Sequence, residues 1–563
     1  MPDQNSWFSQ FKQSQEYRFL SQQPVAYFCT EFGLSSELPT YAGGLGVLAG
    51  DFVKEAGLQN FPLVAVGLYY HEGYARRQLN ATQVKKTSPQ DFGLNLVING
   101  KNEPVLVQIP IQDRLVYAQA WCWQEGLVSI YLLDSNVDEN TPADQQITNR
   151  LYTADKETRI EQELILGIGG LRLLKTLGIN PAIYHLNEGH SAFLVLELIK
   201  QVMESQNLDF SQASRLAREQ VVFTNHTLLP AGREIYNNDL IAAMLGKYAE
   251  SLKIPVTEII PLGLVKDSSL FSMTLFSLQL STKMNAVSAL HAQEAAKIWT
   301  NHPLEQVTNG IFLPRWDQLK LKDKTQLWPK HQENKRKLLG VIQEKTGVSW
   351  DENSLLVGWA RRIVPYKRPL AILEDIPRLQ AIAQKEDQPI RLVFAGLCHG
   401  EDPEKENLLL QLQEILAKEF PQIAVFLSGY NINLAQLLTA GCDVWLNTPV
   451  VKSEACGTSG MKAALNGVLP VSTKDGWIDE VELFGIGWIV EDTEITTSLL
   501  NILEHQVAPM YYEHLKNPTA SNWLNHMQNA RELIVNEFSM SRALKDNLEK
   551  LYLPILKKKL SAK

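Results

Sequence analysis

The sequence has few cysteines and lacks the segments that would direct a protein into a membrane or out of the cell. Its five cysteines form no CxxC pair and show no metal-binding spacing, which favours reduced thiols over a disulfide framework. The start, MPDQNSWFSQFKQSQEYRF, has no features of a secretory signal. The most apolar stretches, such as 61–70, are far shorter than the roughly 20 residues that span a bilayer. We therefore expect a cytoplasmic protein with no membrane partner.

The chain also lacks an excess of positive charge. It carries 53 Lys and Arg against 62 Asp and Glu, which gives a net charge of −9. Nonspecific nucleic-acid binding requires dense neutralisation of phosphates, so the acidic total argues against nucleic acid as a partner. A locally basic pocket for a small anion remains open. Fixed-period repeats are absent, and 45% apolar and 20% charged residues are ordinary values for a globular protein.

Short apolar runs alternate with helical patterns along the whole chain. The runs that we expect to form buried strands are PVAYFC, FPLVAVGLYY, AIYHLN and QVVFTN in the first half and LLVGWA, IRLVFAG, AVFLSG, DVWLNT and GVLPVS in the second. Apolar residues at 160, 164, 168, 171 and 174 predict a helix over 157–177 that ends at Gly178. Strands that alternate with helices indicate an α/β protein with parallel sheets covered by helices on both faces.

A polar, lysine-rich stretch at 317–345 indicates a change of domain. We expect two Rossmann-like domains, residues 1–315 and 316–563, that face each other across a deep crevice. The last helix is a candidate to pack back on the first domain. Ligands of open α/β sheets collect beyond the carboxyl ends of the strands, so we expect the crevice to hold the ligand.

Three motifs of the first half each allow more than one interpretation. The turn YAGGLG (41–46) opens a helix, where backbone N–H groups can bind an anion, although such turns are commonly structural. It is not a GxGxxG dinucleotide motif. HLNEGH (185–190) and TNHT (224–227) place histidines at strand ends. These histidines are candidates for metal ligands, bases or sugar contacts; the alternative is interior side chains whose hydrogen bonds are satisfied within the protein. Without a set of carboxylate partners, their spacing predicts no metal site.

Two motifs of the second half point to phosphate chemistry. RRIVPYKR (361–368) follows LLVGWA, and its Arg362 and Lys367 suit a phosphate dianion, unless the loop is simply solvated. EACGTSGMK (454–462) is a glycine- and hydroxyl-rich turn that leads into a helix. Its N–H groups and Thr458 can bind a phosphate while the amine of Lys462 condenses with an aldehyde. A pyridoxal phosphate site needs this combination; the alternative is a surface lysine after a flexible turn.

Together these segments resemble the α-glucan (glycogen/maltodextrin) phosphorylase family, in particular its short bacterial and archaeal type. EACGTSGMK resembles the family's cofactor motif EASGTxxMK, and RRIVPYKR resembles its phosphate-binding loop. The resemblance keeps the family's motif order from about residue 25 to about residue 490. Its other motifs are TNHT, HLNEGH, VTNGIFLPRW (307–316), YFCTEFGLSSELPTYAGGLGVLAGD (27–51) and YLLDSNVDENTPADQQITNRLY (131–152).

The resemblance implies a cofactor site built on the second half of the chain. Lys462 would hold pyridoxal 5'-phosphate as a Schiff base. The residues implied around the cofactor are Gly457, Thr458 and Arg361 at its phosphate, and Trp316 and Tyr430 near its ring.

The resemblance also implies a substrate site shared by both halves. The groups implied to bind substrate phosphate are Arg362, Lys367 and the backbone of Gly44. The side chains implied to hold the terminal glucose by its hydroxyls are Glu454, Asn309 and His226. The residues implied to line the same pocket are Leu45, His190, Cys456 and Gly457.

The implied fold is the two-domain glycosyltransferase type called GT-B, and the implied reaction is phosphorolysis of α-1,4-glucan ends to glucose 1-phosphate. Glycosidases use paired carboxylates. This family instead sets a cofactor phosphate beside the substrate phosphate, which protonates the leaving oxygen and attacks from the same face, so configuration is retained. Arg361, Arg362 and Lys367 would offset the repulsion between the two phosphates. The partners are then glycogen or maltodextrin, inorganic phosphate and glucose 1-phosphate; a homodimer remains open.

The chain departs from the family pattern at three places. Cys456 stands where Ser is usual, Leu397 where short members usually have Lys, and VVKS (450–453) replaces an arginine-containing stretch. The N-terminal extension that carries control in animal members is absent, so we do not expect that control. Two alternatives remain, a nucleotide-sugar-dependent glucan synthase of the same fold and a non-catalytic glucan-binding paralogue. A synthase would not need Lys462.

Overall fold

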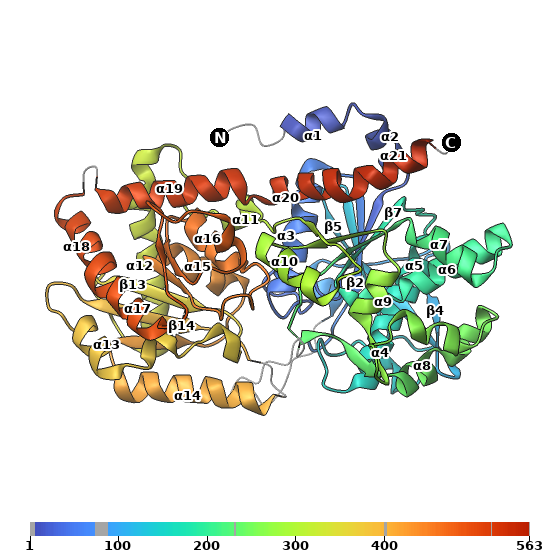
Figure 1. The fold of residues 1–563 in the computed structure, drawn as a ribbon, viewed down its shortest axis with the longest axis horizontal. Helices are drawn as coiled ribbons and strands as arrows, with labels where there is room; N and C mark the ends of the chain where they lie inside the picture. The colour runs from blue at the N-terminus through green and yellow to red at the C-terminus, as the bar shows by residue number, and fades with distance from the viewer. Residues whose placement is uncertain (1–5, 74–87, 230–231, 399–401, 519–520, 562–563) are drawn as a thin grey trace.

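The computed structural model describes residues 6–73, 88–229, 232–398, 402–518 and 521–561. Within these ranges two large sheets lie side by side, each with helices around it (Figure 1). The first sheet is built from strands between residues 25 and 306, and the second from strands between 355 and 489. None of the described helices is long and apolar enough to cross a membrane.

The first sheet is mostly parallel but has an antiparallel edge. Its parallel strands, in spatial order, are β12 (Glu305–Gln306), β11 (Lys283–Ala286), β8 (Val221–Thr224), β7 (Ile183–Asn187), β1 (Val25–Phe28), β2 (Leu63–Leu68) and β6 (Val128–Asp134). Beyond them, β5 (Arg114–Glu125) pairs antiparallel with β6, β3 (Asn95–Leu96) and β4 (Val107–Ile111). This edge was not expected. Buried and more accessible residues alternate along much of β5, as in a strand with one solvated face.

The second sheet is parallel throughout. Its strands, in spatial order, are β15 (Ala424–Leu427), β14 (Ile390–Ala395), β13 (Leu355–Ala360), β16 (Val444–Asn447), β17 (Leu469–Ser472) and β18 (Trp488–Ile489). A separate antiparallel pair joins β9 (Ile235–Asn237) and β10 (Leu270–Ser272). Each run expected to form a buried strand contains one of the observed strands, so the expectation of a mixed α/β protein with parallel sheets is confirmed.

The helices of the first part are α1 (Ser6–Phe11), α2 (Gln15–Gln22), α3 (Gly44–Gln59), α4 (Lys156–Leu164), α5 (Gly170–Thr176), α6 (Leu194–Gln206), α7 (Phe210–Arg218), α8 (Asn238–Ser251), α9 (Met273–Gln279) and α10 (Ala289–Ile298). Those of the second are α11 (Leu313–Trp316), α12 (Leu327–Thr346), α13 (Ile376–Ala383), α14 (Pro403–Glu419), α15 (Ile432–Gly441), α16 (Thr458–Leu465), α17 (Ile495–Ile502), α18 (Ala508–Lys516), α19 (Asn522–Glu537), α20 (Met540–Asn547) and α21 (Leu553–Ser561).

The helix expected over 157–177 is present, with one irregular turn. A π-helical turn at Ile165–Gly169 joins α4 to α5. The glycines there allow close packing on the sheet, since a Cβ at Gly170 would lie 2.7 Å from Phe28 and 2.8 Å from Val66. The buried helix therefore lies directly on β1 and β2.

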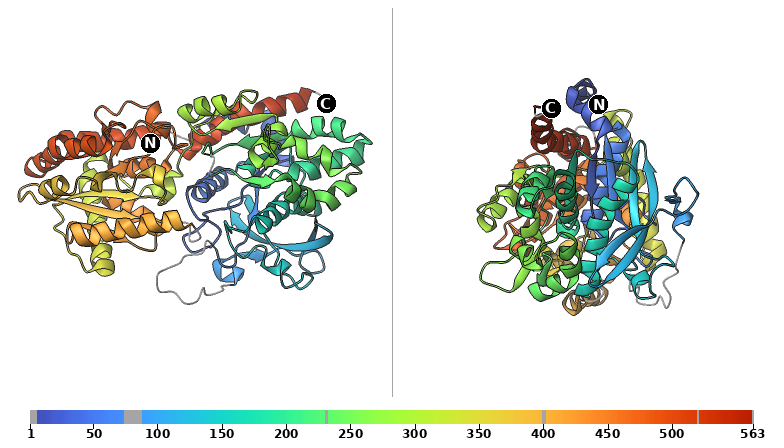
Figure 2. Two further views of the ribbon diagram at one scale, coloured as in Figure 1. Left: turned by 60° about the horizontal axis from the view of Figure 1, so that its bottom comes forward. Right: turned by 90° about the vertical axis from the view of Figure 1, so that its right-hand side faces the viewer.

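The end of the chain crosses back from the second sheet to the first (Figure 1). The hydroxyl of Tyr552, just before α21, lies 2.6 Å from Nδ1 of the buried His185 on β7. Trp7 of α1 donates from its indole to Ser541 Oγ of α20 at 3.1 Å, and α2 lies beside α21 (Figures 1 and 2). The last helices thus complete a hydrophobic core that also contains α3.

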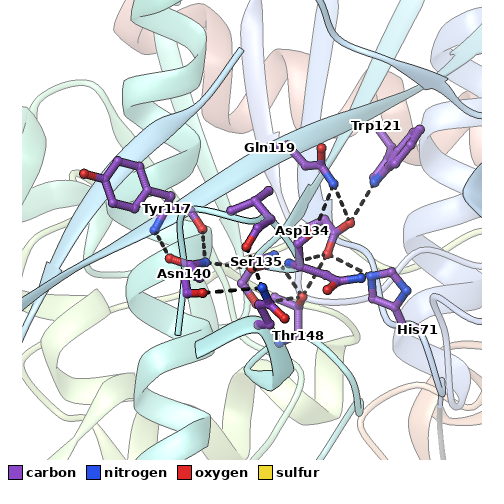
Figure 3. Close-up of polar contacts among 11 residues, drawn as sticks. His71, Tyr117, Gln119, Trp121, Asp134, Ser135, Asn140 and Thr148 are labelled. Carbon is purple, nitrogen blue, oxygen red and sulfur yellow. Dashed lines mark hydrogen bonds and ion pairs between the residues drawn. The ribbon is translucent and has the colours of Figure 1, made fainter. Parts of the chain in front are cut away.

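The carboxylate of Asp134, at the end of β6, organises the motif at 131–152 (Figure 3). It is buried and accepts hydrogen bonds from the indole of Trp121 at 2.9 Å and the amide of Gln119 at 3.1 Å, and it contacts His71 Nε2 at 2.9 Å. Burial alone would raise the pKa of Asp134, but His71, the indole of Trp121 and the backbone N–H of Asn136 lower it below its usual range. An ionised carboxylate therefore ties β2 and β5 to the segment that leads to Tyr152.

A buried ion pair fastens the start of the second sheet. Asp443, just before β16, contacts Lys335 Nζ at 2.5 Å and His331 Nε2 at 2.9 Å, and it accepts from the Leu356 backbone N–H at 2.7 Å. The side chains of Lys335 and Asp443 are fully buried.

Asp443→Ala should destabilise the fold by about 3–5 kcal/mol, because it leaves the Lys335 ammonium buried without its counter-charge. Urea denaturation followed by tryptophan fluorescence measures this effect. Glu333→Ala is the control, since the ion-pair partners of that exposed carboxylate in the described part of the chain are Lys330 and Lys337, on the surface of α12. Equal midpoints for the two variants would contradict the prediction.

Candidate active site

The sequence motifs of the two halves meet where loops from both sheets face each other. Ser288, before α10, donates from its hydroxyl to the backbone oxygen of Ala455 at 2.7 Å. The side chain of Arg362, after β13, lies against Gly43, where a Cβ would be 3.3 Å from the arginine Cδ. The glycine turn, the basic loop and the EACGTSGMK turn are therefore neighbours.

Glu31 holds the glycine turn in place. Its Oε2 accepts from the backbone N–H of Ala42 at 2.6 Å and of Gly43 at 3.3 Å, and its Oε1 accepts from the hydroxyl of Tyr152 at 2.7 Å. Glu31 is buried, whereas Gly44, the first residue of α3, is exposed with open space on its Cβ side. Glu31 thus fixes the N-terminus of α3 on its buried side, and the exposed side of this N-terminus is accessible to a ligand.

The basic loop and the EACGTSGMK turn share a buried charge cluster. Lys367 Nζ contacts Glu454 Oε2, and Arg361 Nη1 lies 3.4 Å from the same oxygen. Burial lowers the pKa of Lys367 to about 8, although Glu454 opposes the shift. Burial alone would raise the pKa of Glu454, but Lys367, Arg361 and Arg362 lower it below its usual range. The carboxylate is therefore ionised and serves as counter-charge for the cations.

Arg362 differs from its neighbours because its side chain has no hydrogen-bond or ion-pair partner in the part of the chain that the structure describes. The residue is exposed, and the nearby Tyr366, Tyr152 and Glu31 raise the pKa of its guanidinium against the effect of burial. It therefore offers a free cation next to the glycine turn.

The amine of Lys462 is held over an aromatic ring. Its Nζ lies 4.1 Å from the ring centroid of Trp316, and the residue is only 7% exposed. Burial lowers the pKa of this amine to about 8. More of this amine is then unprotonated near neutral pH than of an ordinary lysine, and the unprotonated form is the one that attacks an aldehyde. Lys462 is therefore not a solvated surface lysine.

The start of α16, one turn before Lys462, fits a phosphate group. Gly457 has φ +82°, in the left-handed region that favours glycine, and Thr458 begins the helix. Arg361 is buried, and its Nε has no hydrogen-bond partner among the described residues. Tyr430 is half-buried, and burial raises its pKa to about 12 while Arg361 opposes the shift. An amine and an unsatisfied anion site one helical turn apart suit pyridoxal phosphate.

The two histidine motifs, 185–190 and 224–227, lie on the first-sheet side of the site. His226 Nε2 lies 2.7 Å from Asn187 Oδ1, and its backbone N–H donates to Glu188 Oε1 at 2.5 Å. Burial lowers the pKa of His226 to about 3, so its ring is neutral. His190 Nε2 lies 3.7 Å from Glu234, and its buried Nδ1 has no partner within the described ranges. No group of three potential metal ligands occurs in those ranges either.

The remaining predicted residues lie at the edges of this arrangement. Asn309 is half-buried, and its backbone oxygen accepts from Arg542 Nη2 at 2.8 Å. Burial raises the pKa of the Cys456 thiol, while the backbone of Asn309 opposes the shift by hydrogen bonding to it. Leu45 is half-buried in the first turn of α3. A cavity of about 720 Å³ between α12 and α15 contains none of the predicted residues and lies apart from this chemistry.

Comparison with known proteins identifies the family. A model described as "Carbohydrate phosphorylase" matches residues 173–320 and 317–556. The chain belongs to the carbohydrate phosphorylase family. It is 35% identical to a maltodextrin phosphorylase of Thermococcus litoralis over 98% of this chain and 72% of that protein. A glycogen phosphorylase of Mycobacterium tuberculosis is 33% identical over 94% and 71%. One of Aquifex aeolicus is 32% identical over 96% and 88%.

Two of the family departures have a visible structural setting. Leu397 accepts from the Ile363 backbone N–H at 2.9 Å, and its side chain brings no charge to the basic loop. In the 450–453 stretch, the Val450 N–H donates to the Tyr366 oxygen at 2.8 Å. At both places, backbone hydrogen bonds therefore hold the basic loop.

Sequence reasoning missed three residues of the site, of which Glu31 and Asp51 are buried and Tyr152 is half-buried. Glu31, Tyr152 and Asp51 all lie inside motifs that were recognised, but no role was assigned to them. Acidic side chains within otherwise apolar motifs were the available signal, because buried charges need a partner.

Cys456→Ser should lower kcat/KM by less than about tenfold, which is roughly 1.4 kcal/mol of barrier. Thiol and hydroxyl are similar in size, and the Asn309 backbone already hydrogen-bonds at this position. Formation of glucose 1-phosphate from maltodextrin measures the effect. Gly457→Ala is the contrast, because the left-handed φ of Gly457 disfavours a residue with a Cβ, and that Cβ would lie 3.2 Å from Glu454 Cγ. A large loss in Cys456→Ser would assign the thiol a role of its own.

Proposed function

We propose that this protein is an α-1,4-glucan phosphorylase that uses inorganic phosphate to release glucose 1-phosphate from the ends of glycogen or maltodextrin, with retention of configuration. The observation that carries the proposal is that two groups of cationic side chains lie next to each other. One is the start of α16 with Arg361 and Lys462, and the other is Arg362 and Lys367 beside the glycine turn. The names of relatives at 32% to 35% identity support it.

The proposed architecture is GT-B, with domains at 1–315 and 316–563 and the active site between them. Its support is the division of the strands into two sheets and the position of α11, which bridges the two parts. The return of α20 and α21 to the first sheet is consistent with a clamp that holds the domains together.

Pyridoxal 5'-phosphate is the proposed cofactor, held covalently by the amine of Lys462. Its phosphate would lie against the backbone of Gly457 and Thr458 and the free Nε of Arg361. Trp316 and Tyr430 would flank its ring. When bound, the cofactor supplies a phosphate group that exchanges a proton with the substrate phosphate.

Arg362, Lys367 and the N–H of Gly44 are proposed to bind the substrate phosphate. Charge-assisted hydrogen bonds to a dianion are strong in a water-poor site. A phosphate between the two cations would compete with Glu454 for Lys367, which is its partner in the structure. Glu454 would then be released to accept a hydrogen bond from a glucose hydroxyl.

The terminal glucose is proposed to lie on the first-sheet side of the site. The neutral ring of His226 and the amide of Asn309 would hydrogen-bond its hydroxyls. The other residues proposed to line the pocket are Leu45, His190, Cys456 and Gly457. This placement leaves one face of the sugar toward the substrate phosphate, which would protonate the leaving oxygen and then attack on that face.

Incubation with maltodextrin and phosphate should form glucose 1-phosphate, and glucose 1-phosphate should extend maltodextrin in reverse, because Arg362 and Lys367 suit a small phosphate. Enzyme-coupled detection of both directions measures this activity. Incorporation of glucose from ADP-glucose or UDP-glucose, without use of glucose 1-phosphate, would instead identify a synthase. No turnover with either donor would identify a glucan-binding paralogue.

Arg362→Gln and Lys367→Met should each lower kcat by about 10²-fold or more, about 3 kcal/mol, since each removes a donor whose phosphate contact persists in the transition state. The KM for maltodextrin should change little. Steady-state kinetics with phosphate and dextrin varied separately measure both effects. Arg368→Gln is the matched control, because Arg368 lies in the same loop but pairs with Asp492. A steep rise in the dextrin KM with normal phosphate dependence would show that these cations bind sugar.

A further inference from the structure

Asp51 is a buried carboxylate in the second turn of α3 to which no step of the proposed reaction assigns a role. It ends the motif 27–51 and is only 1% exposed. A buried charge costs several kcal/mol unless it is paired and hydrogen-bonded, so its partners indicate its purpose.

Among the described residues, the hydrogen-bond and ion-pair partners of the Asp51 side chain all lie on or beside α11. Its Oδ2 accepts from the indole N–H of Trp316 at 2.7 Å and from the backbone N–H of Phe312 at 3.3 Å. Its Oδ1 lies 3.0 Å from Arg315 Nη1, and both side chains of this ion pair are buried. One carboxylate from α3 thus holds the whole of the short helix α11.

The ring that Asp51 holds is the one that supports Lys462. The Nζ of Lys462 lies 4.1 Å from the centroid of the Trp316 ring. The backbone oxygen of Trp316 accepts a hydrogen bond at 2.9 Å from Asn466, which follows α16. Trp316 is therefore held by α3 through its indole and by the end of α16 through its backbone. Because α3 begins at the exposed Gly44, the same helix sets both the glycine turn and the support of the lysine.

The charges around Lys462 agree with this geometry. The charged groups that shift the pKa of its amine are Asp51 from α3, which raises it, and Arg315 from α11, which lowers it, while burial lowers it most. The carboxylate of Asp51 therefore offsets the positive charge of two buried cations, Lys462 and Arg315.

We propose that Asp51 is a positioning residue that fixes the ring of Trp316 and the nitrogen of Lys462 for the aldehyde of the cofactor. This inference rests on the proposed function, because it assigns Lys462 to a pyridoxal phosphate. It adds a hydrogen-bonded and ionic link between α3, which begins at the glycine turn, and Lys462 on α16.

Two substitutions separate the charge of Asp51 from its hydrogen bond. Asp51→Asn keeps an acceptor for the Trp316 indole but removes the charge, so protonation at the Lys462 nitrogen should move to lower pH by about one unit, a tenfold change in the equilibrium. Asp51→Ala also removes the acceptor, and the purified holoenzyme should then lose its cofactor at least about tenfold faster on dialysis. The absorbance of the bound cofactor, recorded against pH and against time, measures both effects.

Glu55→Gln is the matched control. Glu55 is a buried carboxylate one turn further along α3, where it accepts from Gln59 rather than contacting α11. This variant should leave both the pH midpoint and cofactor retention unchanged. Thermal unfolding of all three variants shows whether a change in retention follows general destabilisation instead.

The inference is overturned if Asp51→Asn keeps the wild-type pH midpoint, or if Asp51→Ala loses cofactor no faster than Glu55→Gln. Failure of the proposed function would look different, because wild-type protein would then carry no pyridoxal phosphate absorbance. In that case the amine of Lys462 is free, and the pH dependence of its acetylation, followed by mass spectrometry, replaces the absorbance midpoint. An acetylation midpoint unchanged in Asp51→Asn would overturn the placement of Asp51 as well.

Discussion

Repulsion among neighbouring cations is the constraint on which the site depends. Arg361, Arg362 and Lys367 gather around Glu454, and the buried amine of Lys462 lies near Arg315. Neighbouring like charges in a poorly hydrated region repel each other. Glu454 offsets the repulsion in the first group, and Asp51 offsets it in the second. The position of each carboxylate therefore decides which cation remains free for an anion.

The counter-charges are themselves fixed by backbone groups that only the complete fold supplies. The N–H of Glu454 donates to Asp475 at 2.9 Å, and the left-handed Gly457 lets the chain turn tightly above it. Glu31 acts in the same way toward the glycine turn, because it binds two N–H groups there. In each case a carboxylate shapes a loop by its hydrogen bonds. The loops are thereby set before any phosphate arrives, which reduces the cost of organising the site around it.

Local patterns in the sequence were enough for nine of the strands and for the helices that open at the glycine-rich turns, because periodicity and glycine act over a few residues. The antiparallel edge was not predicted, because no run between residues 71 and 181, where β3, β4, β5 and β6 lie, was assigned to a strand. Glu31 and Asp51 escaped for another reason. Their partners Tyr152 and Trp316 are 121 and 265 residues away in sequence, and no local pattern encodes such contacts. The family was predicted from its motifs and is confirmed, whereas the roles of individual site residues stay predictions.

The overall charge of the protein bears on which anions the proposed phosphate site would take. The chain has a net charge of −9, and salt screens the effect of charges beyond roughly 8–10 Å. A polyanion would extend over many residues of this acidic chain and would be repelled by their net charge. A small phosphate at the proposed site would meet mainly the field of Arg362 and Lys367, and an uncharged glucan meets no net repulsion. An acidic chain with a few cations gathered in one place therefore favours a small anion and a neutral polymer, the two reactants of the proposed phosphorolysis.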